Sequence, residues 1–414
     1  MSNNCVENDG GEDTMSLTRE QAFFLTVLSD HLNGQQTAPP DELDWRSIAK
    51  YAKSHQVEGI FYHQCKDYLA RHTELSDVAA KLNAANAAAF YYYMNRSAMV
   101  GQLTAELEKE GIPYFIVKGA EVAKLYPVPA LRTMGDTDLV VHTEDRERVH
   151  EMLLQQGWEN TSKDPDYEWR YFKNRMEIEL HDHLVYEEVV TKDEHEAYFN
   201  AFWQYVDGTE LDWNFHFLFL LLHLRKHFMN SGVGFRQFMD LAVVIDKQYS
   251  AMDWTRIEQE LDKLDMLRFA RICFAFCNRW FETNTQIESA DLDRDFYKRA
   301  TEKIFVDGVF GFDNAENRDN QVVNSVRQSK QLPLLSMIAL AWKKVLPSYH
   351  ELMKIDHYAF LKKKPYLLPI AWVYRVIRGL LIGRGELGVR KVKKSFTSAG
   401  TIEKRSDMLS QWGL

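Results

Sequence analysis

The spacing of hydrophobic residues changes along the chain, and the changes predict where helices give way to strands. From residue 17 to about 110, apolar side chains recur every three or four positions, as is typical of amphipathic helices. Asp44 stands where it can cap one of these helices, and Gly111 where it can end the last one. After about residue 205 the helical spacing returns. Helical regions are therefore expected on both sides of a central segment.

The central segment alternates short apolar runs with helical patterns. The run "MEIELHDHL" changes between apolar and polar side chains with the period of two that half-buried strands show. Strands are expected at 112–119, 136–142 and 176–184, a hairpin-like edge between the last two, and helices at 120–127 and 143–157. The pattern predicts an α+β fold, in which a small mixed β-sheet core with helices is embedded between N-terminal and C-terminal helical regions.

The same patterns predict how the chain divides into regions. Its first residues are polar and acidic and lack the apolar stretch of a signal peptide, which indicates a disordered lead. The expected regions are this lead at 1–16, an N-terminal helical region at 17–110, an α/β core at 111–205, a helical domain at 206–330 and a basic helical C-terminal region at 331–414.

Composition and charge narrow the classes of function. The chain has 414 residues and a formal net charge of −10, which disfavours a general nucleic-acid coat protein. Its four cysteines form no CxxC pair, which fits a reducing, cytoplasmic compartment. The most apolar C-terminal stretch, 367–383, contains Arg375 and Arg378 and is too short and too charged to be a transmembrane segment.

Two carboxylates stand close together at the start of the second expected strand, in "MGDTDLVV". Residues i and i+2 of a strand point to the same face, so Asp136 and Asp138 are expected to project together. Two carboxylates this close repel each other, and a divalent cation removes the conflict. Because a D-x-D pair also occurs by chance at protein surfaces, its neighbours decide the interpretation.

The third expected strand offers a further carboxylate for such a cation. Glu179 lies deepest in the apolar pattern of that strand, and Glu177 is the alternative on the same face. Carboxylates from neighbouring strands are typical of sites that hold two divalent ions. We expect Mg²⁺, or Mn²⁺, with Asp136, Asp138 and Glu179 as its ligands.

The turn before the D-x-D strand has residues suited to a phosphate. Gly119 ends the first expected strand and opens a helix, where backbone N–H groups can approach a phosphate. Lys118 and Arg132 would add positive charge to a bound nucleotide. Each of these residues alone is also compatible with a surface ion pair. The prediction of a phosphate site therefore rests on the residues taken together.

Residues further along the chain leave a second kind of metal site open. His181 shares a strand face with Glu179, and His223 and His227 lie one helical turn apart. With His183 and His216 they suggest a zinc or iron hydrolase as a competing enzyme, although the glutamate of an H-E-x-x-H motif is missing. The alternative is a set of polar residues that line a cleft or lie satisfied in the core.

Two further features could contact a ligand or a partner. Arg236 and Asp240, four residues apart at a helix entry, could pair with each other or form a wall over the base or acceptor. The segment 361–394 carries ten basic residues and one acidic residue, interleaved with apolar ones. It is suited to an anionic partner or a membrane surface, or to a packed helix with a solvated basic face.

The residues described above resemble the nucleotidyltransferase superfamily, and more closely a bacterial family of uncharacterised nucleotidyltransferase-like proteins. The resemblance rests on "FIVKGAEVAKLYPVPALRTMGDTDLVV" (115–141) and "IELHDHL" (178–184), with support from "LLLHLRKHF" (220–228) and "GVGFRQFMDL" (232–241). It covers roughly residues 110 to 245.

The resemblance implies that the chain binds Mg²⁺ and a nucleoside triphosphate, with ATP the expected one. It implies transfer of the NMP group to an unidentified acceptor hydroxyl or phosphate, with release of pyrophosphate. Asp136 and Asp138 would bind metal, and Glu179 would be the third carboxylate and help to deprotonate the acceptor. The residues expected at the nucleotide are Lys118, Gly119, Arg132, Gly135 and Arg236, and those expected in the surrounding cleft are Glu177, His181, His223, His227 and Asp240.

The sequence departs from the superfamily at Ala120. Many members have serine in the glycine turn, where its hydroxyl reaches a phosphate, and Ala120 offers none. A catalytically weak or inactive nucleotide-binding protein with a regulatory or scaffold role is therefore the alternative to an enzyme.

Overall fold

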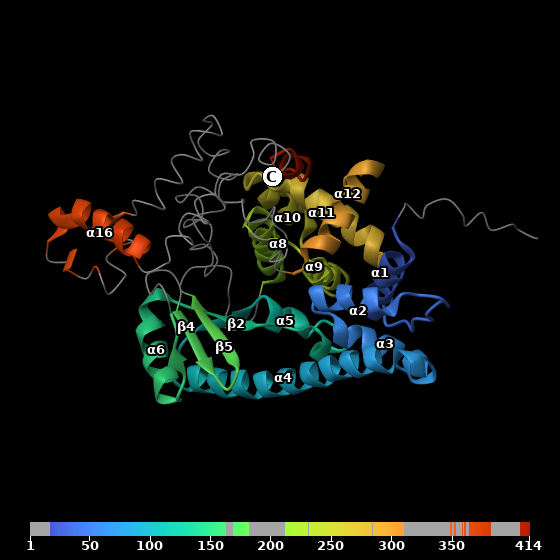
Figure 1. Ribbon diagram of the computed structural model, residues 1–414, viewed down its shortest axis with the longest axis horizontal. Coiled ribbons are helices and arrows are strands. Elements are labelled where there is room, and N and C mark those ends of the chain that lie inside the picture. Colours follow the sequence, from blue (N-terminus) through green and yellow to red (C-terminus); the bar gives the residue numbers. More distant parts are fainter. Residues whose placement is uncertain are drawn as a thin grey trace, which may run out of the picture. The chain divides into compact units, whose positions relative to one another are not determined.

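The computed structural model in Figure 1 divides the chain into two compact units. The first comprises Met1–Phe228, Gly232–Gly311 and Gly413–Leu414, and the second Met229–Ser231 and Phe312–Trp412. The residues that the structure describes are 17–162, 169–181, 212–230, 232–283, 285–309, 348–349, 352, 358, 360–361, 364–381 and 406–414. The boundaries expected near residues 110 and 205 lie within the first unit, and they stay a prediction.

The first unit contains a five-stranded mixed sheet, which confirms the predicted α+β fold. Its strands are β1 (Tyr114–Val117), β2 (Asp136–Val141), β3 (Glu159–Asn160), β4 (Trp169–Lys173) and β5 (Met176–His181). In space their order is β1-β2-β5-β4-β3, and β2 pairs parallel with β5 while the other neighbours are antiparallel. The strands β3 and β4 form the hairpin-like edge that the sequence predicts.

Two helices, α4 (Ser76–Lys109) and α6 (Arg146–Gln155), pack against one face of this sheet through apolar side chains. Leu103 of α4 and Val149 of α6 are buried in one cluster with Leu139 and Ile178 of the sheet. Gly111 has φ +64°, the left-handed conformation that ends α4 and turns the chain into β1. This burial fixes which face of β2 and β5 points to the core, so their carboxylates must lie on the other face.

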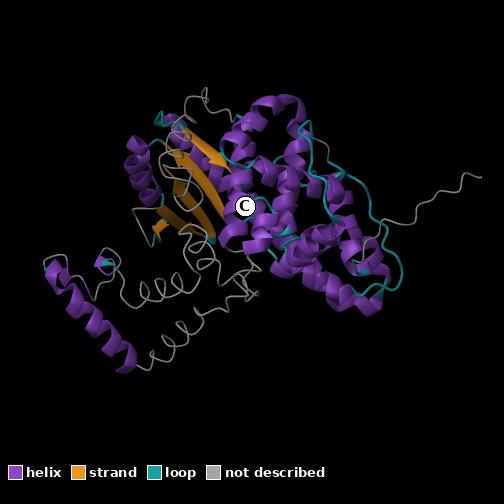
Figure 2. Cartoon of the chain, turned by 90° about the horizontal axis from the view of Figure 1, so that it is seen from above, coloured by secondary structure: helices purple, strands orange, loops and turns teal. Residues whose placement is uncertain are grey.

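Two other helices lie next to the turn that follows β1, the short α5 (Gly119–Ala123) and α8 (Trp213–Asn230). The amide of Lys118 donates a hydrogen bond to Nε2 of His216 in α8 at 2.8 Å, which fixes α8 beside the turn between β1 and α5. Figure 1 shows α4 running along one side of the sheet and α5 between α4 and α8, and Figure 2 shows the strands side by side next to the helices.

The N-terminal helices and the later helices of the first unit share an aromatic core. Phe24 of α1 (Arg19–Leu32) contacts Phe61, Phe235 and Phe305, which come from α3 (Glu58–Arg71), α9 (Phe235–Gln248) and α12 (Arg294–Asp307). Asp44 caps α2 (Trp45–Ser54), as expected, by accepting hydrogen bonds from the amides of Arg46 and Ser47. The remaining elements are α10 (Trp254–Lys263), α11 (Leu267–Phe281) and the 3₁₀ turns Thr73–Leu75, Pro129–Leu131, Thr143–Asp145 and Tyr249–Ala251.

Predicted and observed elements differ mainly at their ends. The helix expected at 120–127 is the shorter α5, and the helix expected at 143–157 begins as a 3₁₀ turn before α6. The strand expected at 176–184 is described as far as His181 in β5, and Asp182 and His183 lie outside the described residues.

In the second unit the structure describes a 3₁₀ turn (Pro365–Leu367) and α16 (Leu368–Leu381). Leu352, Tyr358, Leu361 and Ala371 form a small buried cluster there. Most of the basic side chains of 361–394 lie outside the described residues, so its proposed anionic partner stays a prediction.

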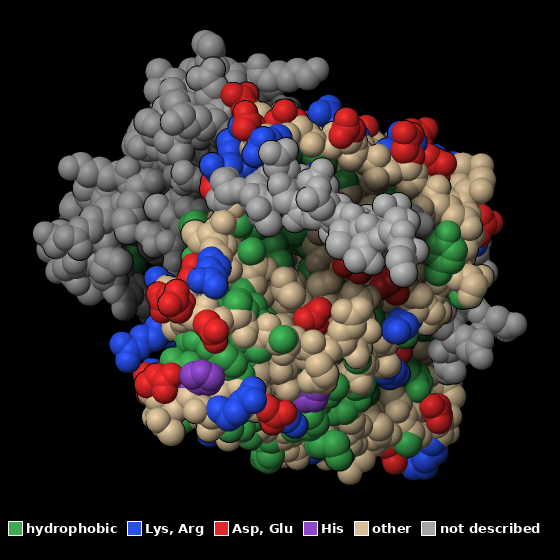
Figure 3. Space-filling model, turned by 90° about the vertical axis from the view of Figure 1, so that its right-hand side faces the viewer, with side chains coloured by type: hydrophobic (Ala, Val, Ile, Leu, Met, Phe, Trp, Pro, Cys, Tyr) green, Lys and Arg blue, Asp and Glu red, His purple; other side chains and the backbone are tan. Residues whose placement is uncertain are grey.

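Two surface properties bear on function. Among the residues that the structure describes, no helix combines the length and the apolar character that a membrane crossing needs. On the face shown in Figure 3, the described acidic and basic side chains are interspersed.

Candidate active site

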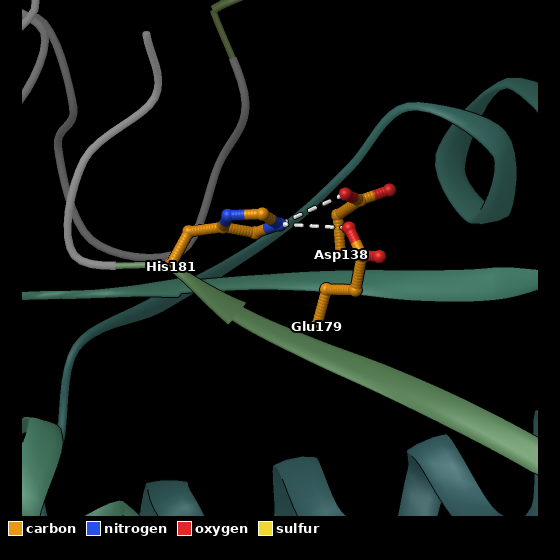
Figure 4. A group of neighbouring side chains, drawn as sticks. All are labelled: Asp138, Glu179 and His181. Atoms are coloured by element: carbon orange, nitrogen blue, oxygen red, sulfur yellow. Dashed lines mark hydrogen bonds and ion pairs between the residues drawn. The ribbon is translucent and has the colours of Figure 1, made fainter. Parts of the chain in front are cut away.

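Parallel pairing of β2 with β5 brings carboxylates from two strands to the same place. Asp138 lies opposite Glu179 and Asp136 opposite Glu177 in the register of the two strands. His181 follows two residues after Glu179, so it shares the face of both pairs. One ligand atom each of Asp138, Glu179 and His181 lies within 4.8 Å of the others, as Figure 4 shows.

These three side chains are buried and point toward one another. His181 Nε2 lies 3.0 Å from Asp138 Oδ1 and 3.6 Å from Glu179 Oε2. The exposed fractions are 2% for Asp138, 6% for Glu179 and 5% for His181. Carboxylates are almost never buried to this extent unless they are paired or bind a metal.

Lys118 supplies positive charge to this group. Its Nζ forms an ion pair with Asp138 Oδ1. Burial by itself would raise the pKa of Asp138, but the ammonium of Lys118 and the hydrogen bond from His181 hold this pKa well below its usual range. Asp138 is therefore ionised at neutral pH.

Arg170 of β4 supplies the second positive charge. It lies opposite Glu179 in the β4–β5 register, and its Nη2 contacts Glu179 Oε1 at 2.8 Å. Its Nη1 contacts Glu177 Oε1 at 3.3 Å. The side chain of Glu177 is 32% exposed and that of Glu179 only 8%, so Glu179 is the glutamate that faces the buried group. Sequence reasoning did not identify Arg170, although the alternation in "EWRYF" could have placed it on this face.

The backbone at Lys118 has an uncommon conformation. Lys118 has φ +54° and ψ −128°, and a residue with a Cβ atom rarely adopts positive φ. The hydrogen bond from its amide to His216 Nε2 holds this conformation. Burial lowers the pKa of His216 to about 3, so its ring is neutral and Nε2 can accept that hydrogen bond. Strained residues held in this way are concentrated at functional sites.

Gly119 is required by the approach of Arg132. A Cβ atom at Gly119 would collide with the guanidinium of Arg132. That guanidinium is itself bound by Asp240 of α9, with Nη2 2.6 Å from Oδ2 and Nε 3.1 Å from Oδ1. Tyr126 donates a further hydrogen bond to Asp240 at 2.8 Å. In this structure Arg132 thus connects the turn to α9.

Arg236 does not form the ion pair with Asp240 that the sequence suggested. Asp240 pairs with Arg132 rather than with Arg236, because Arg132 approaches it with two nitrogens. Arg236 Nη1 instead donates to Gln56 Oε1 at 2.5 Å and to the carbonyl of Thr133 at 2.9 Å. Burial is the main cause that lowers the pKa of Arg236 to about 10, and the nearby charge of Arg132 is the second. Arg236 therefore remains a cation at neutral pH.

The start of β2 is held by an arginine that sequence reasoning missed. Arg96 of α4 donates to the carbonyl of Gly135 at 3.1 Å and to that of Asp136 at 3.5 Å. Asp136 is half-buried, and it lies outside the group of ligand atoms formed by Asp138, Glu179 and His181. No local sequence pattern connects Arg96 to a strand that begins forty residues later.

The histidines of α8 form a pair of their own. His223 and His227 lie with their Nε2 atoms 3.2 Å apart. Burial lowers the pKa of His227 to about 4 and that of His223 well below its usual value. Of the clustered histidines that the structure describes, His181 is the one that joins the possible metal ligands, and His183 lies outside the described residues.

A cleft of about 630 Å³ borders the turn at Ala120. Arg96, Met134 and Trp213 are among the residues that line it. Ala120 also packs against the core cluster beneath the sheet. Its methyl group therefore fills space but offers no hydrogen bond.

The donor set of this site suits a divalent cation. Asp138 and Glu179 offer carboxylate oxygens, His181 offers an imidazole nitrogen, and all three are buried within reach of one ion. A family model described as "Uncharacterised nucleotidyltransferase" matches residues 41–282, which is more than half of the chain and contains every residue of the site. No curated protein and no solved structure gives a significant match.

Proposed function

The chain belongs to the family of uncharacterised nucleotidyltransferases, and on this premise we propose that it moves an NMP group from a nucleoside triphosphate to an acceptor hydroxyl or phosphate. ATP is the proposed donor and pyrophosphate the proposed leaving group. The observation that carries the proposal is the pairing of Asp138 with Glu179 across two parallel strands, beside a strained turn that presents Lys118.

The proposed roles follow from charge and position. Asp136, Asp138 and Glu179 would hold the divalent ion, Mg²⁺ or Mn²⁺, which when bound supplies positive charge to the phosphate oxygens. Lys118 and Arg236 would attract the triphosphate. Gly119 and Gly135 would keep the backbone close to it, and Arg132, which Asp240 holds against Gly119, would orient the turn.

In the proposed reaction an oxygen of the acceptor attacks the α-phosphorus of the nucleotide. The bond from that phosphorus to the oxygen bridging the β-phosphate breaks, and pyrophosphate leaves with that oxygen. A hydroxyl acceptor passes its proton to the carboxylate of Glu179.

The test measures release of pyrophosphate and transfer of label from each of four labelled triphosphates with Mg²⁺ or Mn²⁺, against a panel of acceptors that includes the protein itself. Wild type is expected to turn over and Asp136→Ala/Asp138→Ala to lose turnover. Asp262→Asn, at an exposed position of α10, serves as the matched control and should keep it. Equal turnover in wild type and the double variant would contradict the proposal.

A second candidate is a nucleotide-binding protein without transfer activity, with a regulatory or scaffold role. Ala120 favours it, because the turn lacks the hydroxyl of its relatives in the superfamily. Calorimetric binding of a triphosphate without turnover of any acceptor would support this reading. Consumption of the triphosphate with water as the acceptor would instead support the alternative of a metal-dependent hydrolase, which His181 suggests.

Two proposals concern the surroundings of the protein. The few cysteines, of which the three described ones are free and buried, support a cytoplasmic location. The basic segment 361–394 is proposed to meet an anionic partner or membrane surface. Binding to vesicles with and without anionic lipid tests the second of these proposals.

A further inference from the structure

We infer that His181 is a direct ligand of the bound ion and that the site therefore prefers a transition metal such as Mn²⁺ over Mg²⁺. The inference rests on the proposed function, since it assumes that Asp138 and Glu179 hold a divalent ion. It goes beyond that function because it adds a nitrogen ligand to a set of carboxylates and thereby assigns the class of metal.

The direction of the imidazole carries this inference. His181 Nε2 lies 3.0 Å from an oxygen of Asp138 and 3.6 Å from an oxygen of Glu179, so a single nitrogen faces carboxylates from two different strands. Figure 4 shows the ring pointing into the space between the two acids. A histidine whose role is a single hydrogen bond needs one carboxylate oxygen nearby. A histidine that binds an ion held by two carboxylates faces an oxygen of each.

Each carboxylate also contacts a cation, Lys118 at Asp138 Oδ1 and Arg170 at Glu179 Oε1. A divalent ion bound here would take the place of Lys118 at Asp138. Arg170 contacts Oε1 of Glu179, while Oε2 is the oxygen that faces His181. His181 is 5% exposed, and it lies on the same strand face as Glu179 because two residues separate them. The backbone thus fixes where the imidazole lies relative to both acids.

The chemistry of the donors decides which metals fit. Mg²⁺ prefers oxygen ligands in a nearly ideal octahedron and keeps several of its waters. Imidazole is a good ligand for transition metals, whose affinity for sites with nitrogen and oxygen donors rises from Mn²⁺ onward along the first row. One nitrogen among two carboxylates therefore raises the affinity for Mn²⁺ more than that for Mg²⁺.

The test compares the affinities of Mn²⁺ and Mg²⁺ for the full chain after removal of metals with EDTA, measured by calorimetry without nucleotide. His181→Gln replaces the imidazole with an amide that can still hydrogen-bond to Asp138 but offers an oxygen to the ion. We expect this variant to bind Mn²⁺ at least about 10-fold more weakly and Mg²⁺ within about 2-fold of wild type. His72→Gln, at the end of α3, is the control and should change neither affinity.

Each outcome has one reading. An equal loss of both affinities in His181→Gln, or no loss of either, overturns the inference and leaves His181 a positioning residue. If wild type and Asp138→Asn bind both ions equally poorly, the proposed function fails together with the inference about His181. If Asp138→Asn alone weakens binding, the proposed function stands and only the role of His181 is lost.

A spectroscopic measurement keeps the inference testable if His181→Gln does not fold. Electron spin echo spectra of Mn²⁺ bound to the wild-type chain are expected to show coupling to ¹⁴N of an imidazole. A spectrum with Mn²⁺ bound in an Asp138-dependent manner but without this coupling contradicts the inference.

Discussion

Two buried charge clusters of the first unit match their charges with different geometries. In the first, Arg132 contacts both oxygens of Asp240, and Tyr126 adds a hydrogen bond. In the second, Lys118 and His181 share one oxygen of Asp138, and Arg170 contacts one oxygen of Glu179. We call them the Arg132 cluster (Arg132, Asp240, Tyr126) and the Asp138 cluster (Asp138, Glu179, His181, Lys118).

Exposure does not separate the two clusters. The side chains of Arg132 and Asp240 are 9% and 7% exposed, and those of Lys118 and Asp138 are 13% and 3% exposed. A matched pair between rigid elements stabilises the fold, because separating it would leave a buried charge without a partner. A lysine is a compact point charge on a flexible stem, so Lys118 can exchange its carboxylate for another anion more readily than Arg132, which holds Asp240 with two nitrogens. The difference teaches that burial of charge alone does not mark a reactive site.

The largest effect is expected from breaking the Arg132 cluster. Asp240→Ala leaves Arg132 buried without its partner and should lower the free energy of unfolding by about 3–5 kcal/mol. Denaturant unfolding followed by circular dichroism measures this loss. Arg132→Met/Asp240→Leu replaces both charges and should recover most of the stability. A double variant as unstable as Asp240→Ala would show that packing, rather than charge, is the cause.

The two glutamates of β5, Glu179 in the Asp138 cluster and Glu177 outside it, are expected to differ in their effect on catalysis. Glu179→Gln should reduce the rate of nucleotidyl transfer about 100-fold or more, since it removes charge from the buried group. Glu177→Gln changes a more exposed side chain and should cost less than about 10-fold. Single-turnover rates with the same triphosphate measure both. Equal losses would show that Glu177 shares the site.

The pH dependence of stability should report on the histidine behind the Lys118 turn. Burial lowers the pKa of His216 to about 3 in the folded chain, so below about pH 6.5 the unfolded chain binds a proton that the folded chain does not. The stabilisation is therefore complete above pH 6.5 and falls, by up to about 1.4 kcal/mol per pH unit, as the pH drops toward 3.

His216→Gln isolates this contribution. Glutamine can still accept the hydrogen bond from the Lys118 amide but does not titrate, so its unfolding free energy should vary less steeply between pH 6 and 4 than that of wild type. Urea titrations across that range measure both slopes. Identical slopes in the two proteins would show that other buried histidines, such as His55, account for the pH dependence.

The smallest predicted effect concerns competition for Asp138. Lys118→Met removes the ammonium but keeps much of the volume, so a divalent ion no longer has to displace a cation from Asp138. The affinity for Mn²⁺ without nucleotide should rise at least about 5-fold. Calorimetry against wild type measures the change, with Lys124→Met on the exposed side of α5 as the control. A weaker affinity would mean that Lys118 supports the ion rather than competing with it.

The strands and the faces of their carboxylates follow from local sequence. The period of two in β2 and β5 set Asp138 and Glu179 on a face opposite to the apolar residues, and the structure places them there. The preference for Glu179 over Glu177 rested on its apolar neighbours, and its lower exposure agrees with that reasoning. Their roles in catalysis remain a prediction.

Other parts of the site depend on contacts that a local pattern does not encode. Arg132 and Asp240 are 108 residues apart, and the lysine amide and His216 are 98 residues apart. Helical spacing predicted that Arg236 could form an ion pair with Asp240. In the folded chain Arg132 forms that ion pair instead. Arg170 shows an intermediate case, since its strand was expected only as a hairpin-like edge without a register.

The hydrogen bond from Lys118 to His216 also has a consequence for the order in which the chain is synthesised. A nascent chain that has emerged as far as β5 already contains Asp138, Glu179 and His181, but it lacks the acceptor that holds the Lys118 backbone at positive φ. The hydrogen bond that holds the lysine turn can form only once α8 has left the ribosome and docked. This contact of the site therefore links its amino-terminal strands to a helix made later.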